Sequence, residues 1–116
     1  MAPAGEFDVA TAPALREQLE QSDAASQIFL IADLSHVTFM DSSALTELET
    51  AQARNEADGG WLRLVYRQRA IGQLLRLTGL ASRFPRYATV EDAWNNRPLS
   101  HTHLEAQLTA PSKPAP

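Results

Sequence analysis

The sequence predicts a small α/β domain in which mostly parallel central strands are flanked by helices. Segments with strand character alternate with segments of helical periodicity, which is the pattern of parallel-sheet architectures. The apolar residues from Ile28 to Ala32 supply apolar side chains for both faces of a strand, as at the centre of a covered sheet. A chain of 116 residues is long enough for one hydrophobic core but not for two.

The residue pattern in the first half of the chain predicts the end of a strand, then a helix, then a central strand. Residues 5–9 have the character of a strand end that turns into a helix of about residues 12–22. Thr11 is expected as the N-cap of this helix, and Pro13 lies in its first turn, where a proline loses no intrahelical hydrogen bond. A strand over residues 28–32 follows.

A polar turn follows this strand and contains His36. A second helix is then expected over about residues 43–57, with Asp58-Gly59-Gly60 as its stop. Its periodicity buries alanines and leucines, among them Ala44 and Leu45, and exposes Glu47 and Glu49.

The second half continues the alternation of strands and helices. A strand is expected over residues 61–66 and a helix over about residues 69–78. Residues 85–87 form a short edge strand, where a proline is tolerated. Thr89 opens a last helix through Trp94, in a pattern that resembles a capping box with aspartate in place of glutamate.

Composition sets the limits of the domain. Residues 1–97 form the predicted domain, whereas residues 98–116 hold four of the seven prolines and predict a disordered tail. The absence of cysteine excludes disulfides and thiolate chemistry and agrees with a cytoplasmic location. No apolar run reaches the roughly 18 residues of a membrane-spanning helix, so no membrane insertion is expected.

Charge divides unevenly between the two halves. Residues 1–58 hold two arginines and eleven acidic residues, a net charge of −9, and residues 59–116 carry a net charge of +5. Such a division indicates either a polarised partner surface or two solvated faces that interleave in space. The arginines are scattered and lack interleaved aromatic residues, so no nucleic acid is expected as a partner.

Motifs typical of enzymes are missing from the sequence. It contains neither a nucleophile elbow nor a glycine-rich phosphate loop, and we expect no catalytic residue, cofactor or metal. The most informative segment runs from Asp33 to Thr46, because its serine pair, Ser42 and Ser43, follows a polar turn and places two hydroxyls where a helix begins. Unpaired N–H groups and the dipole favour negative charge there, although aspartate and serine are also common N-caps without further function.

Four segments of the chain, read together, strongly resemble the STAS domain, and more narrowly the bacterial anti-sigma factor antagonists. They are residues 5–19 with a Gly-Glu-Phe-Asp turn, 33–45 with a Met-Asp-Ser-Ser turn, 70–80 and 87–94. The resemblance covers about residues 5–96, and its most specific part is the Met-Asp-Ser-Ser turn.

This resemblance implies a regulatory domain without catalytic activity, whose partner is an anti-sigma factor of the serine-kinase type. In the family, the unmodified antagonist binds the anti-sigma factor, phosphorylation of the serine after the aspartate releases it, and a phosphatase resets the cycle. Carried onto this chain, the resemblance makes Ser42 the phosphorylation site. The residues expected to bind the partner are Asp8, Asp41, Ser43, Ala44, Leu45, Glu47 and Glu49.

The sequence departs from the family pattern at two places that matter for function. Only about four residues precede the Gly-Glu-Phe-Asp turn, where the family usually has a full N-terminal strand pair. Either the true start lies upstream or the sheet lacks an edge strand, and an uncovered edge would allow a homodimer through strand pairing. Ala44 stands where the family usually has glycine, and Thr46 stands at a further small position; each adds bulk where a kinase has to approach.

Two other readings of function therefore remain open. One is a STAS-like scaffold without phosphorylation, an accessory subunit of a stress-sensing or lipid-transport complex. The other is a small hydrolase or nucleotide-binding enzyme that uses Ser42 with His36 or Asp41, although no loop for an oxyanion or a phosphate accompanies the serine.

Overall fold

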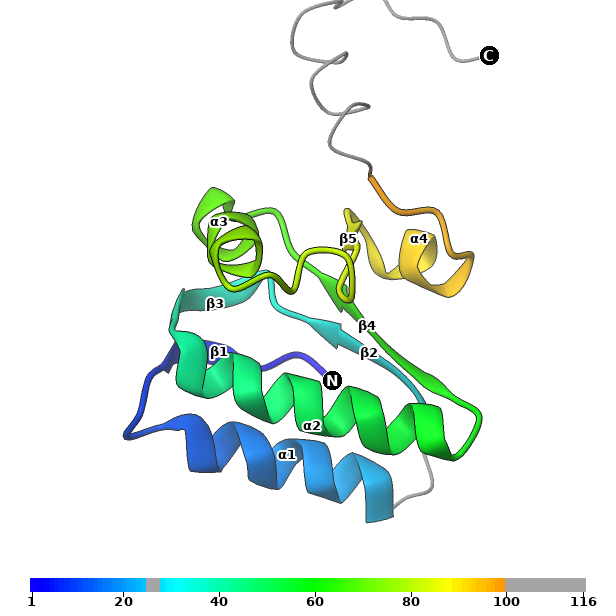
Figure 1. Cartoon of the computed structure of the whole chain (residues 1–116), viewed down its shortest axis with the longest axis horizontal. Helices are drawn as coiled ribbons and strands as arrows, with labels where there is room; N and C mark the ends of the chain where they lie inside the picture. The colour runs from blue at the N-terminus through cyan, green and yellow to red at the C-terminus, as the bar shows by residue number, and fades with distance from the viewer. Residues whose placement is uncertain (25–27, 100–116) are drawn as a thin grey trace, which may run out of the picture.

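Parallel strands lie over two long helices in the computed structural model of the chain, which describes residues 1–24 and 28–99 (Figure 1). The predicted α/β class is confirmed. The described elements are, in chain order, β1 (Ala4–Phe7), α1 (Ala12–Ala24), β2 (Phe29–Asp33), β3 (His36–Met40), α2 (Ser42–Ala57), β4 (Trp61–Val65), α3 (Arg69–Leu77), β5 (Arg86–Tyr87) and α4 (Val90–Trp94).

All strand pairs in the described part of the chain are parallel. β1 pairs with β3, and β4 lies between β2 and β5. Met1 joins the two groups of strands, because its amino group donates to the Ile31 carbonyl and its carbonyl accepts from the Asp33 amide, each at 2.8 Å. The N-terminal segment therefore runs beside β2 and then, as β1, beside β3.

Strand β3 corrects the prediction of a polar turn between the central strand and α2. Asp33 does form a turn, in which its carboxylate accepts from the Ser35 amide at 3.0 Å, but the chain becomes extended again at His36. Residues 36–40 pair with β1, which lies more than 30 residues earlier in the sequence. Because the stabilising partner is distant, the local sequence does not show this strand.

The core lies between the sheet and the pair α1 and α2, which cover one face of it (Figure 1). The buried apolar side chains include Leu15 and Leu19 of α1, Leu45 and Leu48 of α2, and Leu64 of β4. The N-cap predicted at Thr89 is confirmed, because the Thr89 hydroxyl accepts from the Asp92 amide at 3.0 Å, whereas the Asp92 carboxylate, the other half of the predicted capping box, faces Arg97 at 3.6 Å.

The described fold reaches Leu99. The Leu99 amide donates to the Arg86 carbonyl at 2.7 Å, which places residues 98 and 99 beside β5. The remainder of the predicted tail, including His101 and His103, lies outside the described residues.

Gly60 allows the chain to leave α2 and enter β4 at close contact with Ile28. A Cβ atom at position 60 would lie 2.0 Å from the Ile28 carbonyl oxygen, which is also the acceptor of the Trp61 amide. We expect Gly60→Ala to lower the free energy of unfolding by about 1–3 kcal/mol, because the backbone has to move at the first β2–β4 hydrogen bond.

Urea denaturation checks this prediction, with Gly72→Ala as the matched control. The nearest atom to a Cβ at Gly72 would be 3.7 Å away, an ordinary contact, so alanine should stabilise α3 by up to about 1 kcal/mol. If Gly60→Ala and Gly72→Ala changed the free energy of unfolding equally, the close approach of Gly60 to Ile28 would not be what requires glycine there.

Candidate functional site

The N-terminus of α2 is held in place by Asp41. The Asp41 amide donates to the Phe7 carbonyl at the end of β1, at 3.1 Å. Its carboxylate accepts from the Ser43 amide at 2.9 Å, and its carbonyl accepts from the amides of Ala44 and Leu45. Asp41 is therefore the N-cap of α2, and neither serine hydroxyl performs that role.

Ser42 is the first residue of α2, and its side chain is exposed. Its carbonyl accepts a hydrogen bond from the Thr46 hydroxyl at 3.1 Å. Within residues 1–24 and 28–99, no protein group is hydrogen-bonded to the Ser42 hydroxyl. The hydroxyl is thus accessible at the positive end of a helix, where added negative charge is favourable.

Ala44 and Leu45 do not belong to the accessible surface. Their relative exposures are 0% and 2%, and both pack in the core beneath α2. Their part in partner binding stays a prediction; side chains buried in the core would contact a protein docked on α2 only if the core opened. The methyl group of Ala44 points away from solvent and adds no bulk beside Ser42.

Glu47 and Glu49, both expected to be exposed and to bind the partner, are half-buried and lie on different sides of α2. Glu47 faces Arg16 of α1 at 4.0 Å, and Glu49 faces Arg83 in the segment after α3 at 3.6 Å. Two residues two positions apart point about 200° from each other around a helix. These carboxylates therefore lie along the two borders of the exposed face of α2.

The face between these borders is uncharged, and the sequence analysis did not identify it. It consists of Ser42, Thr46, Thr50 and Ala53, here called the outer stripe, all of which are exposed. The Thr50 hydroxyl donates to the Thr46 carbonyl at 3.0 Å, as Thr46 does to Ser42. The sequence does contain a signal for this stripe: small residues recur at helical spacing on the side of α2 opposite its buried positions.

Asp8 lies in the loop between β1 and α1, near the N-terminus of α2 because Phe7 accepts the Asp41 amide. Its carboxylate accepts from the amides of Ala10 and Thr11 at 2.9 and 3.1 Å and from the Thr11 hydroxyl at 3.1 Å. These hydrogen bonds, that of the Thr11 hydroxyl first, lower the pKa of Asp8. The Thr11 hydroxyl, expected to cap α1, instead accepts from the Asp8 amide at 2.8 Å and shares its one hydrogen between the Asp8 carboxylate and the Glu6 carbonyl.

The hydrolase reading requires His36 close to Ser42, and the structure places them apart. His36 is the first residue of β3, and Ser42 follows the end of that strand. Four strand steps of roughly 3.3 Å span about 13 Å. Among the described residues, no group of three or more His, Cys, Asp and Glu side chains is arranged to hold a metal ion.

Membrane-crossing helices are also absent from the described part of the chain, where none is both long and apolar enough.

Comparison with known proteins identifies the family. The STAS domain model matches residues 1–93, and the chain belongs to this family. A comparison with curated proteins finds no match.

Solved structures narrow the comparison within the family. An anti-sigma factor antagonist from Mycobacterium paratuberculosis is similar at 35% identity over 82% of this chain and 80% of that chain, with a TM-score of 0.73. A Thermotoga maritima protein shares 21% identity over 81% of each chain, with a TM-score of 0.74. The antagonist SpoIIAA in its unphosphorylated form shares 18% identity over 83% and 84% of the two chains, with a TM-score of 0.59, and shows the likeness of fold alone.

The cap at Asp41 leads to a stability prediction. Asp41→Ala should lower the free energy of unfolding by about 1 kcal/mol, because the Ser43 amide loses its acceptor. Asp41→Asn keeps a side-chain acceptor and should lower the free energy of unfolding by only a few tenths of 1 kcal/mol. Urea denaturation of these variants is compared with Ser42→Ala and Ser43→Ala, which should be close to neutral; a loss of 1 kcal/mol in either serine variant would contradict the assignment of the cap.

The lowered pKa of Asp8 predicts a pH dependence. A carboxylate whose pKa falls on folding stabilises the protein above its unfolded pKa of about 3.9, and this contribution is lost as the pH falls through the folded pKa. The difference in unfolding free energy between wild type and Asp8→Asn should therefore be larger at pH 7 than at pH 3. A difference that does not change with pH would show that Asp8 acts only as a neutral acceptor.

Proposed function

We propose that the chain is a non-catalytic binding module, an anti-sigma factor antagonist controlled by phosphorylation of Ser42. Its partner is an anti-sigma factor of the serine-kinase type, and a phosphatase resets the modified serine in the cytoplasm. The observation that carries this proposal is the exposed Ser42 hydroxyl directly after the capping Asp41, in a chain of the STAS family. The relative at 35% identity, an anti-sigma factor antagonist, supports the same partner class.

The position of Ser42 supports a switch that leaves the fold intact. A phosphate adds a charge of roughly −1.5 to −2 at pH 7, and the N-terminus of α2 stabilises negative charge. The hydroxyl is exposed and takes part in no described hydrogen bond that a phosphate would break. Modification is therefore compatible with folded α2.

The same charge changes the surface on which a partner would dock. In the unmodified protein, the outer stripe is uncharged from Ser42 to Ala53, with Glu47 and Glu49 at its borders. A phosphate at Ser42 places a solvated dianion at the head of this stripe, beside the carboxylate of Asp41. Docking would then require its desolvation, which weakens the complex.

The roles of the remaining candidate residues follow from their positions. Asp41 and Ser43 shape the α2 N-terminus, Asp8 supplies a nearby acidic loop, and Ala44 and Leu45 support the helix from the core. Because Ala44 faces inward, the added bulk that a kinase meets beside Ser42 is limited to Thr46.

An affinity experiment tests the proposal with full-length protein as bait in native extract. Wild type and Ser42→Ala should recover an ATP-binding anti-sigma factor, identified by mass spectrometry. Ser42→Asp should bind it roughly 5–150-fold more weakly, which corresponds to a coupling of about 1–3 kcal/mol. Ser35→Asp is the matched control, because it places the same charge in an exposed turn at the opposite end of β3.

The outcomes of this experiment separate the phosphorylation switch from the unphosphorylated scaffold. Loss of binding in Ser42→Asp but not in Ser35→Asp, together with a phosphate on Ser42 after incubation with the partner and ATP, supports the switch. Equal recovery of a transporter or stress-sensing scaffold component by all four baits would overturn it and leave an unphosphorylated accessory subunit.

A further inference from the structure

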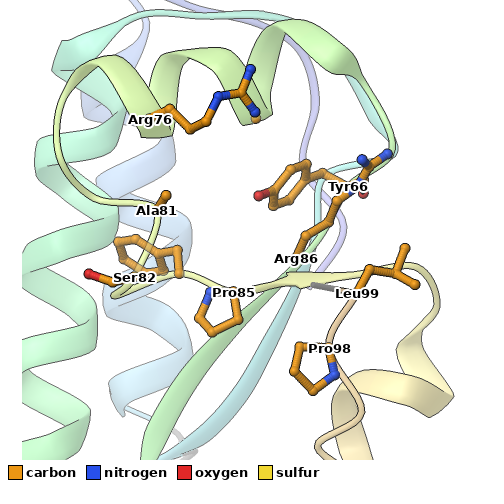
Figure 2. Close-up of a pocket in the computed structure, with 10 residues that line it drawn as sticks. Tyr66, Arg76, Ala81, Ser82, Pro85, Arg86, Pro98 and Leu99 are labelled. Carbon is orange, nitrogen blue, oxygen red and sulfur yellow. Dashed lines mark hydrogen bonds between the residues drawn. The ribbon is translucent and has the colours of Figure 1, made fainter. Parts of the chain in front are cut away.

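A cavity of about 400 Å³ lies beside α3, and neither Ser42 nor Asp41 lines it (Figure 2). Its walls come from α3, from Tyr66 after β4, from the segment of residues 81–86, and from Pro98 and Leu99. The volume is at the lower end of the roughly 300–1,000 Å³ of ligand pockets in proteins. A small ligand would therefore fit it better than a nucleotide or a macromolecule.

Two polar groups converge at one end of this cavity. Position 72 is a glycine, and a Cβ there would lie 3.7 Å from Tyr66 Cε2 and 3.8 Å from Arg76 Nη1. Both side chains therefore lie beside position 72, with the guanidinium group of Arg76 on the same side of α3 as the Tyr66 ring. Figure 2 shows the Tyr66 hydroxyl pointing into the open space below Arg76.

The state of the Tyr66 hydroxyl suits a hydrogen-bond donor. Burial raises the pKa of the Tyr66 phenol, against a smaller opposing effect of the Arg86 and Arg76 guanidinium groups. The phenol is therefore protonated at neutral pH. The Tyr66 hydroxyl and the N–H groups of Arg76 can therefore both donate hydrogen bonds to a ligand, and no negatively charged acceptor among the described residues lies beside them.

The rest of the cavity wall is mainly apolar. Phe84, Pro85, Pro98 and Leu99 form it, and Phe84 is itself buried in the core. Arg86 also lines the cavity, but its Nε donates to the Tyr66 carbonyl at 3.1 Å and its Nη2 to the Arg67 carbonyl at 2.8 Å. Arg86 thus adds positive charge while part of its hydrogen-bonding capacity is used by the backbone.

The surrounding segment favours an anion. Residues 59–90 contain six arginines and no aspartate or glutamate. Within residues 1–24 and 28–99, Arg76 and Arg86 form no ion pair with a carboxylate, whereas Arg83 pairs with Glu49. A positive potential around the cavity mouth attracts negative ligands.

We propose that this cavity binds a small monocarboxylic acid with an apolar body. The carboxylate would accept from Arg76 and the Tyr66 hydroxyl, and the apolar body would lie against Phe84, Pro85 and Leu99. One accessible guanidinium group matches a single carboxylate, which it can bind through two parallel hydrogen bonds. The proposal goes beyond the function proposed above and does not depend on the phosphorylation of Ser42.

Titration of the full-length protein with octanoate, followed by ¹H–¹⁵N NMR, tests the site. Octan-1-ol, which has the same chain length without the charge, is the matched ligand control. Arg76→Gln removes the charge, Tyr66→Phe removes the hydroxyl, and Arg69→Gln removes a charge on the same helix outside the cavity wall. Arg76 and Arg69 are both exposed, so neither variant disturbs the core.

Support consists of saturable shifts at the amides of Gly72, Ala81 and Leu99 with octanoate. Arg76→Gln should then weaken binding by about tenfold or more, Tyr66→Phe by a smaller factor, and Arg69→Gln by less than about twofold. Octan-1-ol should bind about tenfold more weakly than octanoate. Equal losses in Arg76→Gln and Arg69→Gln, equal binding of acid and alcohol, or shifts that map elsewhere would overturn the proposal.

A further outcome concerns the chain itself. Nuclear Overhauser contacts between residues 100–116 and the cavity in the ligand-free protein would overturn the proposal, because the cavity would then be occupied by the chain.

Discussion

The hydrogen bond from the Asp41 amide to the Phe7 carbonyl is the contact on which the candidate site depends. It closes the parallel pairing of β1 with β3 at the point where β3 passes into α2. With its backbone held there, Asp41 can direct its carboxylate to the Ser43 amide and begin the helix. The same contact brings the Asp8 loop to the N-terminus of α2, so one hydrogen bond joins three segments of the site.

The surroundings of α2 then decide which of its residues meet solvent. Its inner face packs in the core through Ala44, Leu45 and Leu48. Ion pairs from Glu47 to α1 and from Glu49 to Arg83 lie along its two sides, and both are partly exposed, so each contributes little to stability. The remaining face is the uncharged outer stripe, which presents Ser42 at its head.

The segment after α3 connects the two proposed binding surfaces. Buried Gln52 of α2 donates to the Arg83 carbonyl at 2.7 Å, and Glu49 faces the Arg83 side chain. The neighbours of Arg83 on both sides, residues 81–82 and 84–86, line the cavity with Arg76. The surface around Ser42 and the cavity therefore share a structural support, although their polar groups are separate and the proposed chemistry differs: covalent phosphorylation at Ser42, and reversible binding of an anion in the cavity.

The sequence by itself determined the α/β class, most of the helices and strands, and the position of Ser42 at a helix start. These features follow from apolar periodicity, capping residues and glycine stops, which act over a few neighbouring residues. The four ordered segments also identified the family, which the match over residues 1–93 confirms.

Only the tertiary structure decided the features that depend on distant partners. Strand β3 exists because residues 36–40 meet β1, and the cap belongs to Asp41 because Phe7 holds its backbone. Helical spacing alone separates Glu47 from Glu49, but packing decided that the first faces Arg16 of α1 and the second faces Arg83. The cavity arises where α3, the end of β4 and residues 98–99 come together. Local sequence patterns carry no record of such contacts, because packing between segments far apart in the chain creates them.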